Sequence, residues 1–240
     1  MKRIDGRRAN QVRPVKIHPQ YVSAPPGSAL IEMGQTRVLC AASVEEAVPR
    51  WMRDQKKTGG WVTAEYSMLP YAAAPRKPRE VARGYPEGRT QEIQRLIGRS
   101  LRAVTDLEKL GARTIWVDCD VLQADGGTRT AAITGGYVAL ALALRKLQAD
   151  GLLSDWPLKA AVAAISAGIV EGEFLLDLCY AEDVAAGVDM NVVMTDAGEF
   201  VEVQGTGEHA TFDQEALGRL LKLAAKGIKE LFRAQQAALR

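Results

Sequence analysis

A strand, a glycine pair and a long helix follow one another between residues 114 and 148, and they constrain the fold more than any other segment. Residues 114–122 alternate as a β-strand does. Gly126 and Gly127 then lead into an Ala- and Leu-rich helix that ends near residue 148. The glycines let backbone N–H groups come close to a ligand, and the helix dipole favours an anion at the same point. The segment therefore predicts a strand-to-helix turn that is a candidate phosphate site.

The rest of the first half predicts three more strands, a loop and a helix. The first two strands are separated by the tight turn at residues 34–35, which indicates a hairpin. A stretch rich in Pro, Arg and Gly follows the third strand and breaks regular structure. The expected elements are strands at 28–33, 36–44 and 61–69, a loop at 70–88, and a helix from residue 90 that ends at Gly111.

The second half repeats the order of strands before a helix. Its expected strands are 159–170, 174–180, 189–195 and 199–204, with Asp213 as the N-cap of a long amphipathic helix. This element order predicts an α+β fold in one domain over residues 1–240. Its halves, roughly 1–150 and 151–240, are expected to be related β-then-α units that share a core.

Composition excludes several classes of protein. Of the 240 residues, 47% are hydrophobic and 25% are charged, which is typical of a globular chain. No apolar run reaches the roughly 18–20 residues that a bilayer span needs, and the basic start of the chain lacks the apolar core of a secretion signal. We therefore expect a soluble, cytoplasmic protein with no membrane partner.

Cysteine and histidine are too few for most metal and nucleophilic sites. Cys40, Cys119 and Cys179 lie far apart in apolar surroundings, so we expect small buried side chains instead of a zinc motif or disulfides. His18 and His209 are expected at the surface. Any metal in this protein would therefore be held by carboxylates.

Positive charge gathers in two segments, although the net charge is only +2. Residues 1–16 carry six lysines and arginines against one aspartate, and residues 76–102 carry eight against three glutamates. Concentrated basic segments in a near-neutral chain favour a surface that grips a polyanion. Solvated surface charge explains the pattern about equally well, and the basic residues of the terminal helix are expected on its solvated face.

Thr128 and Arg129 supply polar groups to the candidate phosphate site. They follow Gly127 directly, at the helix N-terminus, where a hydroxyl and a guanidinium suit an anion. The motif matches neither a Walker A loop nor the three-glycine dinucleotide motif, and an ordinary glycine turn with a threonine cap is the alternative. Arg89 is a candidate second ligand of the same anion, but its position alone is weak support because surface arginines are common.

Asp183 and Asp189 are the main acidic candidates. Asp189 enters a strand on which Asn191 faces the same side, so two carboxylates and an amide can offer oxygen ligands to Mg²⁺ or Mn²⁺. In the alternative, which spacing alone favours, Asp183 is a loop residue and Asp189 a strand-edge cap. Asp118 and Asp120 form a rival pair, which we expect on a solvated strand face.

Five motifs together resemble the bacterial ribonuclease PH family. They lie at residues 37–40, 61–66, 92–99, 118–130 and 189–195, and the resemblance runs nearly end to end. It implies a duplicated β-then-α fold and a phosphate-dependent 3′-to-5′ exoribonuclease. Such an enzyme trims the 3′ ends of transfer RNA precursors, releases nucleoside diphosphates and can also add nucleotides. The resemblance further implies a homohexamer, a trimer of dimers, with active sites facing the central channel.

The same resemblance assigns roles to individual residues. Its phosphate site corresponds to Arg89, Gly127, Thr128 and Arg129, of which Arg129 is also catalytic. Its metal-dependent catalytic pair corresponds to Asp183 and Asp189. Three spaced arginines usually hold the acceptor stem of the RNA; here Arg76 and Arg79 keep two positions, and Tyr71 replaces the first. Tyr71 either stacks on a base or ribose, or leaves transfer RNA binding weaker.

Two other functions compete with phosphorolysis. A hydrolytic metal nuclease needs a denser cluster of carboxylates than one pair, and it leaves the glycine-rich anion site without a role. A non-catalytic RNA-binding ring subunit of an exosome-like assembly would have lost its phosphate or acidic residues. The intact Thr128, Arg129, Asp183 and Asp189 argue against this second alternative.

Overall fold

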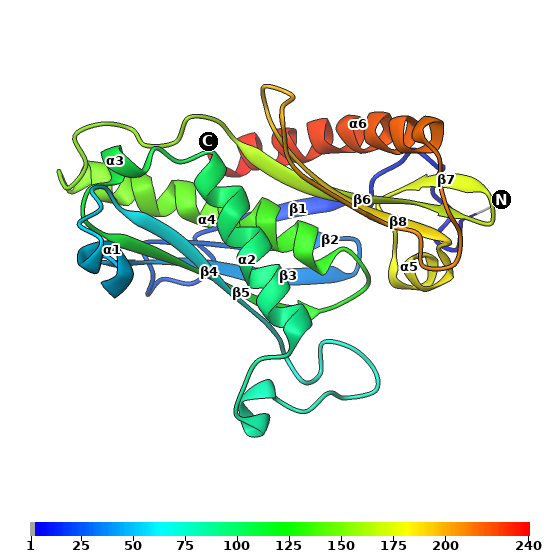
Figure 1. The fold of residues 1–240 in the computed structure, drawn as a ribbon, viewed down its shortest axis with the longest axis horizontal. Coiled ribbons are helices and arrows are strands. Elements are labelled where there is room, and N and C mark those ends of the chain that lie inside the picture. The colour runs from blue at the N-terminus through cyan, green and yellow to red at the C-terminus, as the bar shows by residue number, and fades with distance from the viewer. Residues whose placement is uncertain (1–2) are drawn as a thin grey trace.

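The computed structural model describes residues 3–240, with only the backbone described at residues 81 and 83. Within these residues, two β-sheets and three long helices form the body of the molecule (Figure 1). The first sheet has the order β1-β2-β3-β5-β4; β4 and β5 are parallel and the other pairs antiparallel. Its strands are β1 (Val15–Pro19), β2 (Gly27–Met33), β3 (Thr36–Glu45), β4 (Trp61–Met68) and β5 (Thr114–Gln123).

The second sheet is antiparallel throughout and has the order β7-β6-β8-β9. Its strands are β6 (Val162–Val170), β7 (Glu173–Leu176), β8 (Val188–Thr195) and β9 (Phe200–Thr206). The Ala- and Val-rich β6 is buried along almost its whole length, because both α4 (Thr128–Ala149) and α6 (Gln214–Ala238) pack on it.

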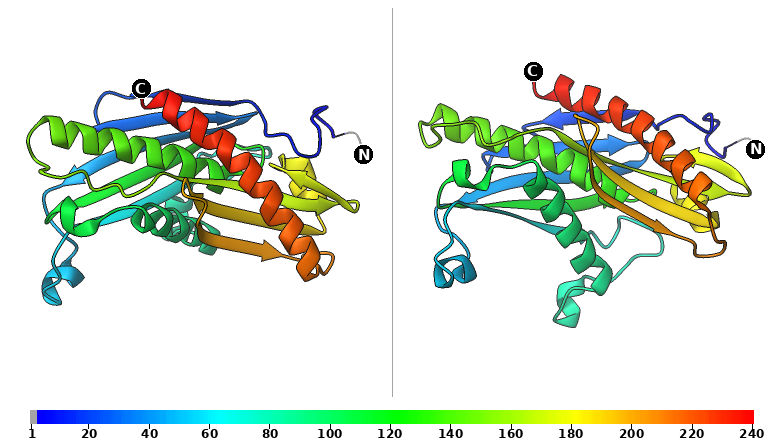
Figure 2. Two further views of the ribbon diagram at one scale, coloured as in Figure 1. Left: turned by 90° about the horizontal axis from the view of Figure 1, so that it is seen from above. Right: turned by 45° about the horizontal axis from the view of Figure 1, so that its top comes forward.

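Helix α4 lies at the centre of the core. Its sequence is apolar on all sides, so most of its length is buried. It contacts β2 and β3 of the first sheet and β6 of the second. Helix α2 (Gly88–Ala103) packs beside it over β4, and α6 crosses it (Figure 2). One continuous cluster of buried apolar residues therefore includes residues from both sheets and all three long helices.

The helix expected from residue 90 to Gly111 is two helices, α2 and α3 (Leu107–Leu110). The Asp106 carboxylate causes the break: it caps α3 by accepting hydrogen bonds from the N–H groups of Glu108 and Lys109 at 3.2 and 3.3 Å. The expectation was wrong because the apolar spacing of α2 continues into α3, so periodicity alone does not reveal the cap.

Several short elements also differ from the expectations. Helix α1 (Arg50–Asp54) and strand β1 were missed, because each is only five residues long and gives too short a pattern to read. A single 3₁₀ turn, η1 (Glu80–Arg83), interrupts the expected loop at 70–88.

The strands of the second half are shorter than expected. The strand expected at 159–170 begins at Val162. The strand expected at 174–180 ends at Leu176, because Asp177 has a φ of 54°, a left-handed conformation that ends an extended strand. The chain then forms α5 (Tyr180–Ala185). The capping role of Asp213 is confirmed: its carboxylate accepts a hydrogen bond from the Ala216 N–H at 2.8 Å.

Three of the five described basic residues in the first basic segment do not contribute to a polyanion-binding surface, whereas Arg8 and Lys16 are exposed. Arg3, Arg7 and Arg13 are buried, and each is paired with a carboxylate. Their positive charge is compensated inside the protein, so the expectation of a basic surface at these three positions is wrong. Lys2, the sixth basic residue of this segment, lies outside the described residues.

The expectations for cysteine and histidine are confirmed. Cys40, Cys119 and Cys179 are buried and free, and the Sγ atoms of Cys40 and Cys119 each lie 3.8 Å from the carbonyl oxygen of Ala132 in α4. His18 and His209 are exposed. Between residues 3 and 240, no helix combines the length and apolar character required to cross a membrane.

Candidate active site

The glycine-rich turn between β5 and α4 forms one wall of the candidate site. Gly126 and Gly127 have φ values of 72° and 66°, in the left-handed region that other residues rarely adopt. A Cβ atom on Gly126 would lie 2.6 Å from the carbonyl oxygen of Leu178, so this turn packs tightly against the segment before α5. No side chain caps α4 at Gly127. The N–H groups in the first turn of this long helix are therefore available to an anion.

Thr128 and Tyr66 share a buried hydrogen bond beside this turn. Tyr66 points inward from β4, and its hydroxyl oxygen lies 2.8 Å from Oγ1 of Thr128. Burial raises the pKa of Tyr66, so its hydroxyl stays protonated and can donate to Thr128. The hydrogen of the Thr128 hydroxyl is then left for an anion. The sequence analysis missed Tyr66; the only signal was a hydroxyl at an inward position of a strand.

Arg89 and Arg129 bring positive charge to the same place from two helices. Each is the second residue of its helix, α2 for Arg89 and α4 for Arg129. Both guanidinium groups act on Asp183, where they oppose the effect of burial on its pKa. An Nη1 atom of Arg129 lies 3.6 Å from Oε1 of Glu92 and 3.4 Å from Oε1 of Gln204, so this side chain is held from both α2 and β9. Both guanidinium groups also lower the pKa of Tyr66, whose hydroxyl is hydrogen-bonded to Thr128 beside the glycine-rich turn.

Asp183 and Asp189 face this positive charge from the second half of the chain. Asp183 lies on α5 instead of in a loop, and Asp189 is the second residue of β8. Burial raises the pKa of both carboxyls, and the negative charge of Asp183 raises the pKa of Asp189 further. The charge of Glu208, a residue that was not predicted from the sequence, also raises the pKa of both carboxyls. The structure therefore brings together carboxylates that repel one another.

This donor set fits a hard divalent cation, because a cation relieves the repulsion between two neighbouring carboxylates. In the described part of the chain, no group of three or more Asp, Glu, His or Cys side chains is arranged to hold a metal ion. Asp183 and Asp189 would therefore supply the carboxylate ligands, with water and substrate oxygens completing the shell, as Mg²⁺ commonly binds. Asn191 lies on the same face of β8 as Asp189, opposite Gln204 of β9.

The rival acidic pair lies on a different surface. Asp118 and Asp120 point away from the core, in alternation with the buried Cys119 and its neighbours on β5. They are half-buried, and burial raises the pKa of each. Glu65, which is directly opposite Asp118 on β4, raises the pKa of Asp118 further, and Arg79 opposes the shift of Asp120. The face is less solvated than expected, and neither arginine of the candidate site acts on it.

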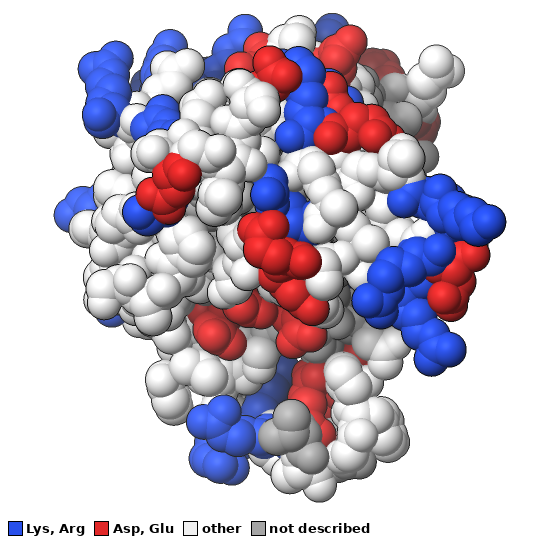
Figure 3. Space-filling model, turned by 90° about the vertical axis from the view of Figure 1, so that its left-hand side faces the viewer, with Lys and Arg blue, Asp and Glu red and all other residues white. Residues whose placement is uncertain are grey.

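Tyr71, Arg76 and Arg79 are exposed on the loop between β4 and α2, which projects from the body at the bottom of Figure 1. Arg79 and Tyr66 line the same cavity, of about 290 Å³, between this loop and the start of α2. Figure 3 shows Lys and Arg side chains on the projecting part, with acidic side chains on the body above it. The structure thus connects Arg79 to the site, whereas Tyr71 lies at the base of the loop, next to the buried Ala72, whose carbonyl accepts a hydrogen bond from the Ala124 N–H at 2.8 Å.

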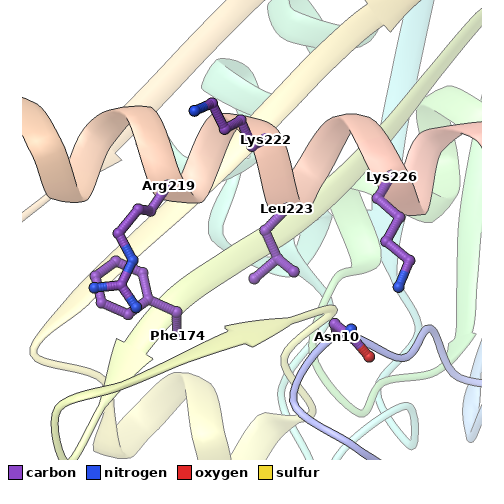
Figure 4. Close-up of a pocket in the computed structure, with 6 residues that line it drawn as sticks. All are labelled: Asn10, Phe174, Arg219, Lys222, Leu223 and Lys226. Atoms are coloured by element: carbon purple, nitrogen blue, oxygen red, sulfur yellow. The ribbon is translucent and has the colours of Figure 1, made fainter.

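A second cavity, of about 360 Å³, lies along α6 (Figure 4). Its lining residues are Asn10, Phe174, Arg219, Lys222, Leu223 and Lys226. The Arg219 guanidinium stacks on the Phe174 ring, 3.7 Å from its centroid. The basic side chains of α6 are exposed, as expected for a solvated face, and this cavity shares no lining residue with the glycine-rich turn.

Two family models match the chain. Residues 11–146 match the 3′ exoribonuclease family, domain 1, and residues 160–227 match the 3′ exoribonuclease family, domain 2. A protein from Corynebacterium kroppenstedtii named ribonuclease PH is 59% identical over 237 residues, which cover 99% of this chain and 92% of that protein. A protein of the same name from Bacillus pumilus is 58% identical over 236 residues, which cover 98% and 97% of the two chains.

Solved structures share the fold at lower identity. A chain of the Archaeoglobus fulgidus exosome with RNA bound to the active site is 23% identical, with a TM-score of 0.80 over 97% of this chain and 92% of that chain. A chain of an archaeal exosome core is 20% identical, with a TM-score of 0.78 over 98% and 91%. These likenesses confirm the expected α+β fold, and at such identities they show the fold alone.

Proposed function

The chain belongs to the 3′ exoribonuclease family, and we propose that Arg89, Arg129 and the turn at Gly127 and Thr128 hold inorganic phosphate as the nucleophile of this family's reaction. The protein is a phosphate-dependent 3′-to-5′ exoribonuclease that trims transfer RNA and releases nucleoside diphosphates. One observation supports the assignment of the site: the charges of Arg89 and Arg129 both act on Asp183, and the N-terminus of α4 beside them has no side-chain cap.

Charge explains why the reaction needs this arrangement. A phosphate dianion must approach a phosphodiester that is itself negative, so the site has to offset the repulsion and hold nucleophile, phosphorus and leaving 3′ oxygen in line. Arg89 and Arg129 supply two permanent positive charges, and the first N–H groups of α4 add oriented donors. Phosphate requires no general base, which agrees with the absence of histidine among the candidate residues. The bonds made and broken are similar, so nucleotide addition from diphosphates follows as the reverse reaction.

Asp183 and Asp189 would hold Mg²⁺ or Mn²⁺ on the side of the site opposite the arginines. A bound ion would supply positive charge to offset the negative charge of the scissile phosphodiester. Arg129, which acts on both carboxyls, partly offsets the rise in their pKa that burial causes. Binding of the nucleophile and binding of the cation would thus fall to different residues. The arginines and the turn would bind the nucleophile, and the carboxylates would bind the cation that the RNA approaches.

We further propose that Tyr71, Arg76 and Arg79 contact the body of the RNA and that the protein acts in the cytoplasm as a homohexamer, a trimer of dimers. The projecting position and exposure of the loop support the first proposal, because the loop can reach RNA outside the site. The continuous core shared by the two halves supports a single folding domain. A non-catalytic ring subunit is less well supported, since relatives at 56–59% identity are named ribonuclease PH.

The experiment that tests the proposed function follows the released nucleotides. The purified protein and Mg²⁺ are incubated with a 3′-extended transfer RNA, with and without inorganic phosphate, and the products are separated by chromatography. Nucleoside diphosphates that appear only with phosphate support phosphorolysis. Monophosphates released without phosphate would indicate a hydrolase, and no release would favour the non-catalytic subunit.

We expect Tyr66→Phe to lower kcat/KM for phosphate by about 5- to 30-fold, because a typical buried hydrogen bond contributes about 1–2 kcal/mol and the Thr128 hydroxyl would lose its orienting donor. Steady-state kinetics at varied phosphate measure the effect. Tyr137→Phe is the matched control, since Tyr137 is also buried but lies within α4. Equal kinetics of the two variants would contradict an orienting role for Tyr66.

We expect Tyr71→Arg to strengthen binding of transfer RNA and to steepen its dependence on salt by about one unit of slope, because the new cation neutralises one further phosphate. Filter binding at several salt concentrations measures both quantities. Tyr21→Arg, at another exposed tyrosine, controls for the added charge. Weaker binding by Tyr71→Arg would instead show that the tyrosine ring stacks on the RNA.

A further inference from the structure

Three arginines of the N-terminal segment are buried at the end of the molecule that also holds β7 and α5 (Figures 1 and 2). Buried arginines are rare unless every donor finds an acceptor. Arg3, Arg7 and Arg13 all find acceptors between residues 176 and 182, the segment that leads into the helix carrying Asp183. The segment is thus part of the structure that supports the carboxylate side of the site.

Arg13 reaches furthest, because it also contacts the glycine-rich turn. Its Nε and one Nη donate to the two carboxylate oxygens of Asp177 at 3.0 and 2.6 Å, and its backbone N–H donates to the same carboxylate at 2.8 Å. The other Nη donates to the carbonyl oxygen of Asp125, and an Nη lies 3.4 Å from that of Gly126. One guanidinium therefore connects the segment before α5 to the turn at the N-terminus of α4.

The Gly126 carbonyl also accepts a hydrogen bond from the Thr36 hydroxyl at 2.7 Å, whereas the Asp125 carbonyl accepts from Arg13. A Cβ on Gly127 would lie 3.0 Å from an Nη atom of Arg13, so the guanidinium packs directly beneath this glycine. Only a planar fork with several donors can satisfy the Asp177 carboxylate and the two carbonyls together; a lysine ammonium at the end of its stem cannot reach all of them. The position thus requires the shape of arginine as well as its charge.

Arg3 connects the N-terminal segment to α5 itself. Its Nε and Nη donate to both carboxylate oxygens of Glu182 at 2.7 and 2.5 Å, and a further Nη donates to the Leu176 carbonyl at 2.8 Å. Burial disfavours the charged form of Glu182, yet Arg3 holds the pKa of this carboxyl below its usual value. Glu182 precedes Asp183 on α5, so the pair fixes the helix that presents the first carboxylate.

We propose that Arg13 is a positioning residue for phosphorolysis: it sets the place of the phosphate-binding turn relative to the segment that carries Asp183. This inference rests on the proposed function, because it assumes that the turn binds phosphate. Loss of the Arg13 guanidinium is expected to displace the turn, although Arg89 and Arg129, the proposed phosphate ligands, remain. A displacement of about 1 Å at such a site can cost about 100-fold in rate.

The test compares Arg13→Lys with Arg7→Lys. Arg7 is a matched control: it is buried in the same segment and donates to the backbone carbonyl of Asp177 at 3.0 Å, but its contacts lie at residues 5, 11, 176, 177 and 182 and not in the turn. We expect Arg13→Lys to raise the KM for phosphate by about 10- to 100-fold, with the Kd for RNA unchanged. For Arg7→Lys we expect a lower Tm and an unchanged phosphate KM.

A direct binding measurement separates this inference from the proposed function. Inorganic phosphate alone is titrated calorimetrically into the wild-type protein and both variants. If the wild type binds no phosphate, the proposed function fails. If the wild type binds phosphate and both variants bind it equally well, Arg13 does not position the turn. If Arg13→Lys does not fold, Asp177→Asn is measured instead. This variant keeps the size of the Asp177 side chain and one acceptor oxygen. A wild-type phosphate KM in Asp177→Asn would overturn the inference.

Discussion

Arg89→Ala is expected to raise the phosphate KM and to lower kcat/KM for phosphate by about 100-fold or more, while RNA binding stays nearly unchanged. The reason is that Arg89 faces the site from the start of α2, and the variant removes a permanent charge from the nucleophile. Steady-state phosphorolysis at varied phosphate gives the first two quantities. Filter binding of the same RNA without phosphate gives the third.

Arg95→Ala is the matched control for this variant, because Arg95 is an exposed arginine on the same helix and not a member of the candidate site. It is expected to keep the wild-type phosphate KM. Unchanged phosphate dependence in Arg89→Ala would remove Arg89 from the site. A loss of RNA binding with an unchanged phosphate KM would assign it to the RNA instead.

Asp189→Asn is expected to lower kcat by about 100- to 1000-fold at ordinary Mg²⁺ concentrations, with the protein still folded. The amide keeps the size of the side chain but removes one of the two negative charges available to the cation. Phosphorolysis across a titration of Mg²⁺ and Mn²⁺, with Tm measured in parallel, checks this result. Wild-type activity at low Mg²⁺ would contradict a metal-binding role for Asp189.

The raised pKa values of Asp183 and Asp189 predict how metal dependence changes with pH. A proton and the cation compete for the same carboxylates, and burial makes protonation set in at a higher pH than for ordinary aspartates. Lowering the pH is therefore expected to raise the Mg²⁺ concentration needed for half-maximal activity. Asp118→Asn should leave this dependence unchanged, since Asp118 has a raised pKa but lies on the outer face of the first sheet. A half-maximal Mg²⁺ concentration independent of pH would contradict the assignment.

Local signals predicted most of the long elements. The strand, glycine pair and helix around Gly127 were predicted because period-two and helical patterns depend only on neighbouring residues. The hairpins of both halves and the cap at Asp213 were predicted for the same reason. The break before α3 and the end of β7 at Asp177 were not, because they depend on a side-chain cap and on a left-handed backbone that apolar periodicity does not report.

Some residues of the candidate site could likewise be predicted from local sequence signals, and others could not. Thr128 and Arg129 stand out in the sequence because they adjoin a glycine pair, whereas Arg89 became a firm candidate only through the family resemblance. Glu208 carries no local signal, and the only signal at Tyr66 is a hydroxyl at an inward position of a strand. They enter the site because β4 lies beside the start of α4, and because the chain after β9 returns to β8.

By itself, then, the sequence determined the order of most elements, the glycine-rich turn as a candidate anion site, and the family. The tertiary structure alone decided which charges act together. The arginines of residues 1–16 illustrate this: the sequence indicated a basic surface, but Arg13 is buried between Asp177 and the glycine-rich turn, more than a hundred residues away along the chain. The free energy of a charged side chain depends on its solvation and its partners, and both are set by contacts between segments distant in sequence.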